Sequence, residues 1–279
     1  MFSQLPASSI HFTSSASIDF DLDWEATSKE IVSFIESYVK KSQARGVVVG
    51  LSGGVDSSVV TKLSVMALGQ RNVLGVLMPT NFTPQTDMED ARSLALQLGI
   101  QTRIIDIGSI DQAFGTSLGV PSGDKGMKIP FANIRARIRM TILYFFANRL
   151  NYLVAGTGDR SEDLIGYFTK YGDGGVDLLP ISHLYKSQVR KLADFLGLPL
   201  KISSKPSSPQ LYPGHKATDE IPADYELLDR IEKMLFDDRL SPAEVSLKCR
   251  VNGNLVDEVM RRYSSSGHKR LYPPMLREW

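Results

Sequence analysis

Residues 50–58, with the sequence GLSGGVDSS, are the part of the chain best suited to bind a charged ligand. They directly follow the apolar run GVVV at residues 46–49. A buried strand that ends at Ser-Gly-Gly, followed by a helix that begins at Val-Asp-Ser-Ser, turns main-chain amides and the positive end of the helix dipole toward one point. Gly53 and Gly54 can adopt backbone angles that other residues avoid, so a phosphate can approach the main chain closely. The segment therefore predicts a phosphate-binding loop.

Asp56 lies inside this loop, where many phosphate loops carry Gly-Lys-Ser or Gly-Lys-Thr instead. A carboxylate beside phosphates is favourable mainly when Mg²⁺ lies between them, because the cation binds oxygen atoms of both groups. Asp56 therefore predicts a Mg²⁺ site. Two structural alternatives stay open here. The loop could be a glycine-rich turn without a ligand, and Asp56 could stabilise the helix dipole as an N-terminal carboxylate.

Residues 156–180 form a second segment with chemical character, GTGDRSEDLIGYFTKYGDGGVDLLP. It has few apolar residues for its length and many Gly, Asp, Lys and Thr, which is typical of a loop that lines a substrate site. Glu162 and Lys170 lie within it, and Lys186 follows it. Taken singly, an acid or a lysine is more often exposed to solvent, so a role for these three depends on the surrounding pattern.

Strands and helices alternate around these two segments. We expect strands over residues 47–51, 73–78, 102–107 and 152–155, and helices over residues 23–41, 57–68, 87–98 and 131–149. This order predicts an α/β fold, a doubly wound parallel sheet with helices on both faces. Ligands of such sheets bind at the carboxyl ends of the strands, where residues 52–58 and 156–158 would both lie.

The rest of the chain divides by composition. Residues 1–22, rich in serine and without helical periodicity, predict a flexible arm ahead of a single domain over residues 23–279. Residues 201–222, rich in proline and serine, predict a lid. The last part of the chain, about residues 223–279, has a residue pattern typical of helix–turn–helix segments. We interpret it as structural packing, because DNA-binding versions carry a basic face and this chain is nearly neutral.

The bulk properties exclude several classes of function. Lys and Arg (32) nearly balance Asp and Glu (31) in this chain of 279 residues, so the net charge of +1 provides no general attraction to nucleic acid. The single cysteine, Cys249, excludes an intrachain disulfide and a multi-cysteine metal site. No stretch approaches the roughly 20 apolar residues that cross a membrane, and no signal peptide is evident. We therefore predict a cytoplasmic protein without a membrane or nucleic-acid partner.

The motifs resemble those of a known family. SGGVDSS resembles the pyrophosphate-binding loop of the ATP pyrophosphatase superfamily, and FTKYGDGGVDLLP is similar to a signature of ammonia-dependent NAD synthetases. Further matches are NIRARIRM at residues 133–140, YKSQVR at 185–190 and His268-Lys-Arg near the Pro-Pro pair, so the resemblance covers about residues 24–274. It implies amidation of deamido-NAD by ammonia, through an acyl-adenylate, with ATP cleaved to AMP and pyrophosphate.

The resemblance also implies roles for individual residues. The positions that it aligns with ATP contacts are Gly50, Leu51, Ser52, Gly53, Gly54, Val55, Asp56, Ser57, Ser58, Thr157, Lys186 and Ser208. The positions that it aligns with deamido-NAD contacts are Arg137, Lys170, Asp177, His268 and Lys269. Asp56 and Glu162 would bind Mg²⁺, and Asp56, Lys186 and Asp173 would be catalytic, Asp173 by orienting or deprotonating ammonium.

The partners follow from the same resemblance. In the family, the long helix at residues 131–149 builds a dimer interface whose cleft binds deamido-NAD, so a homodimer is expected. Of Arg135, Arg137 and Arg139, which alternate along this helix and cannot share one face, we expect Arg137 at the ligand and the others in ion pairs or at an interface. A fused glutaminase domain would need a nucleophilic cysteine and far more than the roughly 45 residues before the loop. Ammonia would then be free or come from a separate partner.

The sequence departs from the family pattern in the lid. Ala217 takes the position of a Gln, Pro209 that of a small residue, and the spacing from Asp219-Glu220 to Tyr225 is shorter. These differences leave the acid substrate open, so one alternative is an AMP-forming amide ligase with another carboxylate. A tRNA-modifying ATP pyrophosphatase and a non-catalytic nucleotide sensor are further alternatives. The neutral charge and the single cysteine disfavour the first, and the Asp56–Glu162 pair disfavours the second.

Overall fold

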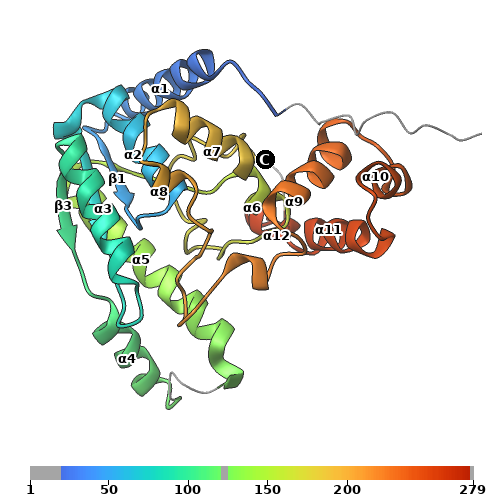
Figure 1. Ribbon diagram of the computed structural model, residues 1–279. Coiled ribbons are helices and arrows are strands. Elements are labelled where there is room, and N and C mark those ends of the chain that lie inside the picture. Colours follow the sequence, from blue (N-terminus) through green and yellow to red (C-terminus); the bar gives the residue numbers. More distant parts are fainter. Residues whose placement is uncertain (1–19, 121–124, 277–279) are drawn as a thin grey trace, which may run out of the picture.

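The computed structural model describes residues 20–120 and 125–276, which form a parallel sheet flanked by helices and followed by a helical C-terminal part (Figure 1). The strands are β1 (Val47–Gly50), β2 (Val73–Leu77), β3 (Gln101–Ile104) and β4 (Leu153–Ala155). They are hydrogen-bonded in the order β3-β2-β1-β4, and every pair is parallel. The doubly wound parallel sheet predicted from the sequence is therefore confirmed.

The strand order places the switch point of the sheet between β1 and β4. The chain moves outward from β1 to β2 and β3 and then returns to add β4 on the other side of β1. Val49 of β1 pairs with Ala155 of β4, so the two strands end at the same level. Parallel sheets bind ligands in the crevice at this point. Both segments singled out from the sequence leave the sheet there.

Helices cover both faces of the sheet because alternate strand residues point to opposite sides. Val47 and Val49 pack with α1 (Trp24–Lys41), α2 (Val55–Leu68), α3 (Gln85–Leu98) and α7 (Lys186–Phe195) in one apolar core. Val48 packs with α5 (Lys128–Leu150) in a second core on the opposite face. β3 is an edge strand and is mostly exposed.

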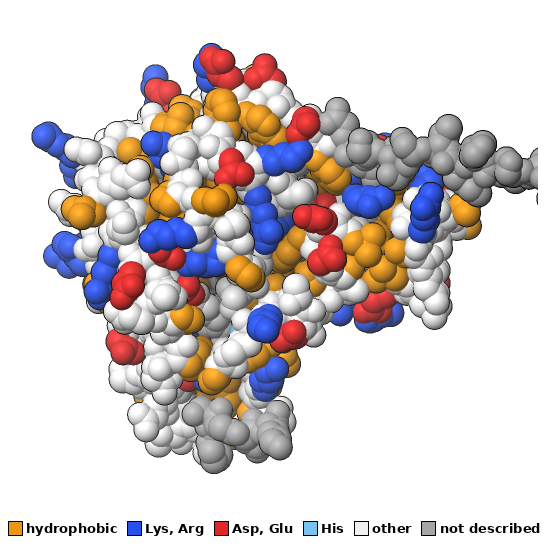
Figure 2. Space-filling view, in the orientation of Figure 1, with side chains coloured by type: hydrophobic (Ala, Val, Ile, Leu, Met, Phe, Trp, Pro, Cys, Tyr) orange, Lys and Arg blue, Asp and Glu red, His pale blue; other side chains and the backbone are white. Residues whose placement is uncertain are grey.

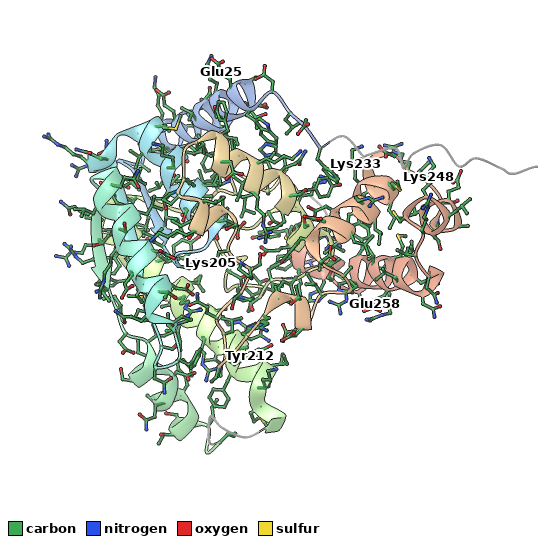
Figure 3. All side chains as sticks on the ribbon, viewed as in Figure 1. Glu25, Lys205, Tyr212, Lys233, Lys248 and Glu258 are labelled. Atoms are coloured by element: carbon green, nitrogen blue, oxygen red, sulfur yellow. The ribbon has the colours of Figure 1, made fainter. Side chains whose placement is uncertain are left out.

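The C-terminal helices have an apolar core of their own. It joins α9 (Tyr225–Glu232), a π-helical turn over Lys233–Asp237, α10 (Pro242–Cys249) and α11 (Gly253–Ser265). The short helix α12 (Gly267–Arg270) follows. Figure 3 places the labelled Lys233, Lys248 and Glu258 on this part of the molecule. Cys249 is buried in this core, close to Met234.

Several element boundaries differ from those predicted. α5 begins at Lys128, before Pro130, because proline is tolerated in the first turn of a helix where its missing N–H has no partner to lose. Helix α4 (Gly108–Ser117) was not expected, since Gly108 and Gly115 weaken its helical pattern. Two more short helices, α6 (Arg160–Leu164) and α8 (Leu200–Ser203), lie in segments expected to be loops.

Residues 1–19 of the expected arm lie outside the described residues. The part of the arm that is described contacts α7: Phe20 meets Tyr185 edge to face, and Asp21 pairs with Lys191. Positive and negative side chains are interspersed over the face shown in Figure 2. Within residues 20–120 and 125–276, no helix has the length and apolar character needed to cross a membrane.

Candidate active site

A cavity of about 260 Å³ lies at the carboxyl ends of the strands. Its walls come from the loop after β1, the ends of β2 and β4, helix α5 and the segment from Lys205 to Leu211. Eight residues predicted to bind ATP line it, although they come from three separate parts of the chain: Gly50, Leu51, Ser52, Gly54, Val55, Asp56, Thr157 and Ser208. Glu162 and Asp173 also line it.

The loop after β1 has the shape expected of a phosphate-binding loop. Gly53 has φ +80°, and a Cβ atom there would lie 2.3 Å from the main-chain oxygen of Asp87, so only glycine fits. Ser52 Oγ lies 3.1 Å from Ser57 Oγ, and Ser58 Oγ donates to the Gly54 carbonyl at 2.7 Å. No side chain in the described part of the chain caps the first turn of α2. Its amides are therefore available to an anion.

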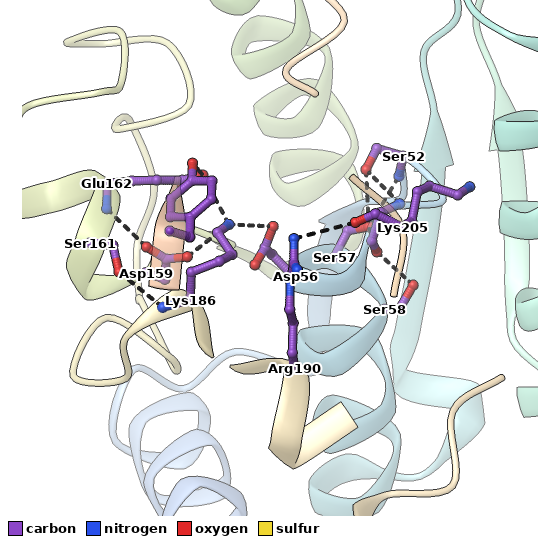
Figure 4. A network of polar contacts seen from close by, with 12 residues as sticks. Ser52, Asp56, Ser57, Ser58, Asp159, Ser161, Glu162, Lys186, Arg190 and Lys205 are labelled. Atoms are coloured by element: carbon purple, nitrogen blue, oxygen red, sulfur yellow. Dashed lines mark hydrogen bonds and ion pairs between the residues drawn. The ribbon is translucent and has the colours of Figure 1, made fainter. Parts of the chain in front are cut away.

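Lys186 joins the two predicted site segments. Its ammonium lies 2.9 Å from Asp56 Oδ2, 2.7 Å from Asp159 Oδ2 and 3.0 Å from Glu162 Oε1, and its side chain is completely buried (Figure 4). Asp56 belongs to α2, Asp159 and Glu162 to the start of α6, and Lys186 is the first residue of α7. Three helix N-termini thus converge on one nitrogen atom.

The electrostatics of this cluster are unbalanced. Burial alone would lower the pKa of Lys186, but Asp159, Asp56 and Glu162 outweigh burial and raise its pKa well above the ordinary value. The ammonium is therefore permanently charged. Burial raises the pKa of Glu162 to about 8, against the opposing effect of Lys186. Three carboxylates face one ammonium, so the cluster has an excess of two negative charges when all its groups are ionised.

Two members of the cluster were not identified from the sequence. Asp159 is completely buried and accepts a hydrogen bond from the Glu162 N–H at 2.9 Å as the N-cap of α6. An Asp three residues before a Glu is a recognisable helix start, so this signal was present. Tyr225 of α9 places its ring 5.1 Å from Lys186 Nζ and its hydroxyl 3.4 Å from Glu162 Oε1. Nothing in the local sequence indicates that contact.

Four of the five residues predicted to bind deamido-NAD lie together. Arg137 donates to the Lys170 carbonyl at 3.3 Å, and the Lys170 ammonium donates to the carbonyl of His268. The Lys269 ammonium donates to the carbonyls of Gly166 and Phe168 at 2.7 and 2.8 Å. Helix α12 therefore packs against the loop that contains Lys170, and the group forms one basic region.

Asp177, the fifth residue predicted to bind deamido-NAD, and Asp173 both accept hydrogen bonds from main-chain N–H groups. Asp177 accepts from the Val154 N–H at 2.7 Å and from the Tyr144 hydroxyl at 3.0 Å, which connects the loop to β4 and α5. Asp173 accepts from the Thr169 N–H at 2.8 Å and lines the cavity. The carboxylate of Asp177 is thus already satisfied within the chain, whereas Asp173 is at the cavity wall.

The other two arginines of α5 have different roles. Arg135 is buried and forms the ion pair expected of it, with Asp111 at 2.8 Å. Arg139 instead lines the cavity, where it donates to the carbonyl of Met78 at 3.3 Å, and burial lowers its pKa to about 10. The cavity therefore contains an arginine that the sequence did not assign to it.

The segment over residues 201–222 covers the cavity. Lys205 donates to the Gly53 carbonyl at 3.1 Å and to Asp87 at 2.8 Å, so it holds one end of the segment on the phosphate-binding loop. Arg135 donates to the carbonyl of Leu211 at 2.6 Å, which holds a later part of the segment on α5. In Figure 3, Lys205 lies near the centre of the molecule and Tyr212 lies beside α5.

Comparisons with known proteins agree with this geometry. The sequence model of the family described as NAD synthase matches residues 27–273. The chain is 50% identical to the NH(3)-dependent NAD(+) synthetase of Hyperthermus butylicus over 255 residues, which cover 91% of each chain. It is similar to the NH3-dependent NAD synthetase of Campylobacter jejuni (TM-score 0.76, 33% identity, 92% and 100% covered). It is also similar to the NMN synthetase of Francisella tularensis (TM-score 0.79, 31% identity, 91% and 99% covered). This chain therefore belongs to the NAD synthase family.

Proposed function

We propose that this protein is an ammonia-dependent NAD synthetase, which amidates deamido-NAD and cleaves ATP to AMP and pyrophosphate. The observation that carries the proposal is the contact of one buried ammonium, that of Lys186, with Asp56 of the phosphate-binding loop and with Glu162 after β4. It joins the two segments that the reaction requires to act together. The family membership supports the same reaction.

The chemistry explains why ATP is needed. A carboxylate is a poor electrophile, because its charge repels a nucleophile and oxide is a poor leaving group. One oxygen of the nicotinate carboxylate attacks the α-phosphorus of ATP, and the bond from that phosphorus to pyrophosphate breaks. Ammonia then attacks the acyl carbon, the bond to AMP breaks, and nitrogen loses a proton. The protein must align the reacting groups and exclude water from the adenylate.

We assign the phosphates of ATP to the loop from Gly50 to Ser58. The free amides at the start of α2 and the hydroxyl of Ser52 provide donors there. In this proposal Ser57 and Ser58 act by holding the loop, since their hydroxyls donate to the Gly54 carbonyl. Thr157, Lys186 and Ser208 complete the ATP contacts in this proposal. Lys186 would stabilise the charge that develops on the α-phosphate, because its ammonium is fixed before the reaction begins.

Deamido-NAD is assigned to the basic region formed by Arg137, Lys170, His268 and Lys269. Arg137, Lys170 and Lys269 carry positive charge, and the loop that they contact includes Asp173 at the cavity wall. Asp173 would accept a proton from ammonium or orient it. Asp177 would act mainly by holding the loop in place, since both of its oxygens accept hydrogen bonds from the chain.

Asp56 and Glu162 would hold Mg²⁺. In the described part of the chain no three acidic, histidine or cysteine side chains form a ready metal site. Two observations nevertheless fit a divalent cation: Asp56 Oδ1 is buried without a hydrogen-bond partner among the described residues, and three carboxylates share the single ammonium of Lys186. Two protein carboxylates, completed by phosphate oxygens and water, are a usual set for Mg²⁺. Bound Mg²⁺ would neutralise phosphate charge.

We also propose a homodimer formed through α5. Ile129 and Phe145 of this helix are exposed, as are the stacked rings of Phe34 and Tyr38 on α1. Where such side chains form one continuous patch, they favour a covered surface. Analytical ultracentrifugation should give twice the chain mass of 30.9 kDa. A species of the single-chain mass at micromolar concentration would contradict this part of the proposal.

The acid substrate is tested by an assay of pyrophosphate release with a panel of carboxylates. Each reaction contains ATP, Mg²⁺, ammonium and one acid: deamido-NAD, nicotinic acid mononucleotide, aspartate or none. The mononucleotide is included because of the similarity to an NMN synthetase. We expect AMP, pyrophosphate and NAD in equal amounts with deamido-NAD. A preference for the mononucleotide would reassign the substrate, and ATP binding without AMP release would contradict an enzymatic role.

A further inference from the structure

Helix α9 contributes to the active site although it belongs to the C-terminal helical part. Tyr225 and Asp229 are four residues apart and therefore lie on the same face of this helix. Tyr225 meets the ammonium of Lys186 with its ring, at 5.1 Å. Asp229 meets the main chain at the start of α7, where Lys186 is the first helical residue. One face of α9 thus contacts the side chain of Lys186, through Tyr225, and the amide of the next residue, Ser187, through Asp229.

Asp229 supports the first two amides of α7, the second directly and the first through Ser161. Its Oδ2 accepts a hydrogen bond from the Ser187 N–H at 2.8 Å, and its Oδ1 accepts one from the Ser161 hydroxyl at 2.6 Å. Ser161 Oγ in turn accepts a hydrogen bond from the Lys186 N–H at 2.9 Å. Asp229, Ser161 and Lys186 are all completely buried. The position of the Lys186 main chain therefore depends on a chain of hydrogen bonds that water does not reach.

The physical need for such a carboxylate is clear from the position of Lys186. The start of a helix carries a partial positive charge, so a lysine at the first position is disfavoured there. Amides at that position also lack partners within the helix. The negative charge of Asp229 offsets the unfavourable charge. The missing amide partners are supplied by Asp229 for Ser187 and by Ser161, itself held by Asp229, for Lys186. A displacement of the first turn of α7 would also move the Lys186 ammonium. The side chain is completely buried and has no space to adopt another conformation that would keep the ammonium in place.

We propose that Asp229 is a positioning residue for the amidation reaction: through Ser161 and the first turn of α7, it holds the Lys186 ammonium against Asp56, Asp159 and Glu162. This inference rests on the proposed function of Lys186 at the phosphates of ATP. Asp229 accepts hydrogen bonds from the Ser161 hydroxyl and the Ser187 amide, neither of which we assign to substrate. Its effect should therefore appear, through Lys186, in the rate of the chemical step and in the affinity for ATP.

The test uses Asp229→Asn, Ser161→Ala and a matched control, Glu232→Gln. Asparagine keeps the shape of aspartate. Its NH₂ group, however, would face one of the two donors from which the carboxylate now accepts a hydrogen bond. Glu232 lies on the same helix, three residues from Asp229, and is equally buried. Neither of its oxygens has a hydrogen-bond partner among the described residues. The control therefore changes a buried acid on α9 without changing the contacts to α7.

For Asp229→Asn we expect kcat to fall about 10- to 100-fold, while the KM for ammonium changes by less than about twofold. Ser161→Ala should act in the same direction, and the double variant should lose less than the product of the two single effects. Glu232→Gln should stay within about twofold of the original kcat. All rates are divided by the folded fraction measured by circular dichroism, so that a loss of folded protein is not counted as a loss of catalysis.

The affinity for a non-hydrolysable ATP analogue gives a readout independent of turnover. We expect Asp229→Asn to weaken it, in titration calorimetry, by about tenfold. The unaltered protein could make no NAD while Asp229→Asn still loses affinity for the ATP analogue. That result would contradict the proposed acid substrate and support the positioning role of Asp229. An unchanged kcat and an unchanged affinity in Asp229→Asn would overturn the inference, as would an equal loss in Glu232→Gln. Should Asp229→Asn not fold, Ser161→Ala decides by the same two readouts.

Discussion

Asp56 and Glu162 each place a carboxylate oxygen within 3.0 Å of the same nitrogen atom, Lys186 Nζ, although they lie on different helices far apart in the sequence. The sheet explains this relationship. β1 and β4 are parallel neighbours that end at the same level, and α2 and α6 begin just beyond those ends. Residues that follow the two strands are therefore brought together at the switch point of the sheet.

Replacing Asp56 by Asn should reduce AMP release by at least about 100-fold. The amide keeps the size of the side chain but removes the charge that we assign to Mg²⁺ binding, and Asp56 Oδ1 is a buried oxygen without a hydrogen-bond partner in the described chain. The measurement is AMP formation with saturating ATP, deamido-NAD and ammonium. Far-ultraviolet circular dichroism should be unchanged. Turnover like that of the unaltered protein would refute the metal assignment.

Replacing Lys186 by Met should destabilise the protein by about 3–5 kcal/mol, because three carboxylates would lose their buried counter-charge. Urea denaturation without added metal measures this change. Lys191→Met is the matched control on the same helix. Its ion pair with Asp21 is exposed, so its loss should cost about 0–1 kcal/mol. Equal unfolding midpoints for the two variants would show that the cluster does not depend on Lys186.

Gly53→Ala should abolish tight binding of ATP and destabilise the protein by about 1–3 kcal/mol. The residue has φ +80°, and the new methyl group would meet the Asp87 carbonyl at 2.3 Å. Gly69→Ala is the control for the backbone angle alone. Gly69 has φ +76°, and a methyl group added there would have no heavy atom of the described chain within 4 Å.

Gly69→Ala should therefore lose about 1–2 kcal/mol of stability and no activity. A Gly53→Ala protein that binds ATP normally would contradict the close contact between the phosphate-binding loop and α3.

The stability of the segment over residues 201–222 should depend on pH through His215. Burial lowers the pKa of His215 below its ordinary value of 6.5, although Glu220, 3.0 Å away, opposes this. The unfolded chain therefore binds a proton more readily than the folded one, so stability falls as pH is lowered through about 6.5. His215→Gln removes this contribution.

Thermal melts at about pH 7.5 and pH 5.5 measure the effect, since both values lie above the range in which most carboxylates titrate. The original protein should lose more stability than His215→Gln between these two pH values. An equal or smaller loss in the original protein would mean that the imidazole is not kept neutral by its surroundings.

The sequence was sufficient to predict the sheet and the strand–loop–helix turn at residues 50–58. The apolar runs and the Gly-Gly pair are set by the local backbone and its immediate neighbours. At Gly53, for example, the backbone angle and the nearby Asp87 carbonyl leave no space for a side chain. Contacts between distant elements could not be predicted in the same way. Tyr225 and Asp229 reach Lys186 only because α9 packs beside α6 and α7, and no local pattern specifies that packing.

The arginines of α5 show the same limit within one helix. Periodicity indicated that Arg135, Arg137 and Arg139 point in different directions, but it could not specify which of them faces the cavity. Arg139 does so, because the cavity lies on its side of α5. The choice depends on the rotation of the helix against the sheet, which is set by the apolar residues that pack in the second core.

Several of the contacts that hold the segment over residues 201–222 do not depend on its side chains, which fits the departures from the family pattern expected there. Arg135, Arg139 and Arg190 donate to main-chain carbonyls of Leu211, Gln210 and Lys205. Main-chain oxygens are present whatever the side chains are, so the segment can change in sequence and keep these contacts. Ala217, in the position of the expected Gln, is buried in the core of the C-terminal helices.

The fate of one oxygen atom tests the proposed reaction most directly. Deamido-NAD labelled with ¹⁸O in the nicotinate carboxylate is incubated with the protein, ATP, Mg²⁺ and ammonium, and the products are separated and weighed by mass spectrometry. Attack of the carboxylate on the α-phosphorus predicts that each AMP formed carries one labelled oxygen and that pyrophosphate carries none. Formation of NAD with unlabelled AMP would contradict the acyl-adenylate route, and an absence of NAD would contradict the proposed function itself.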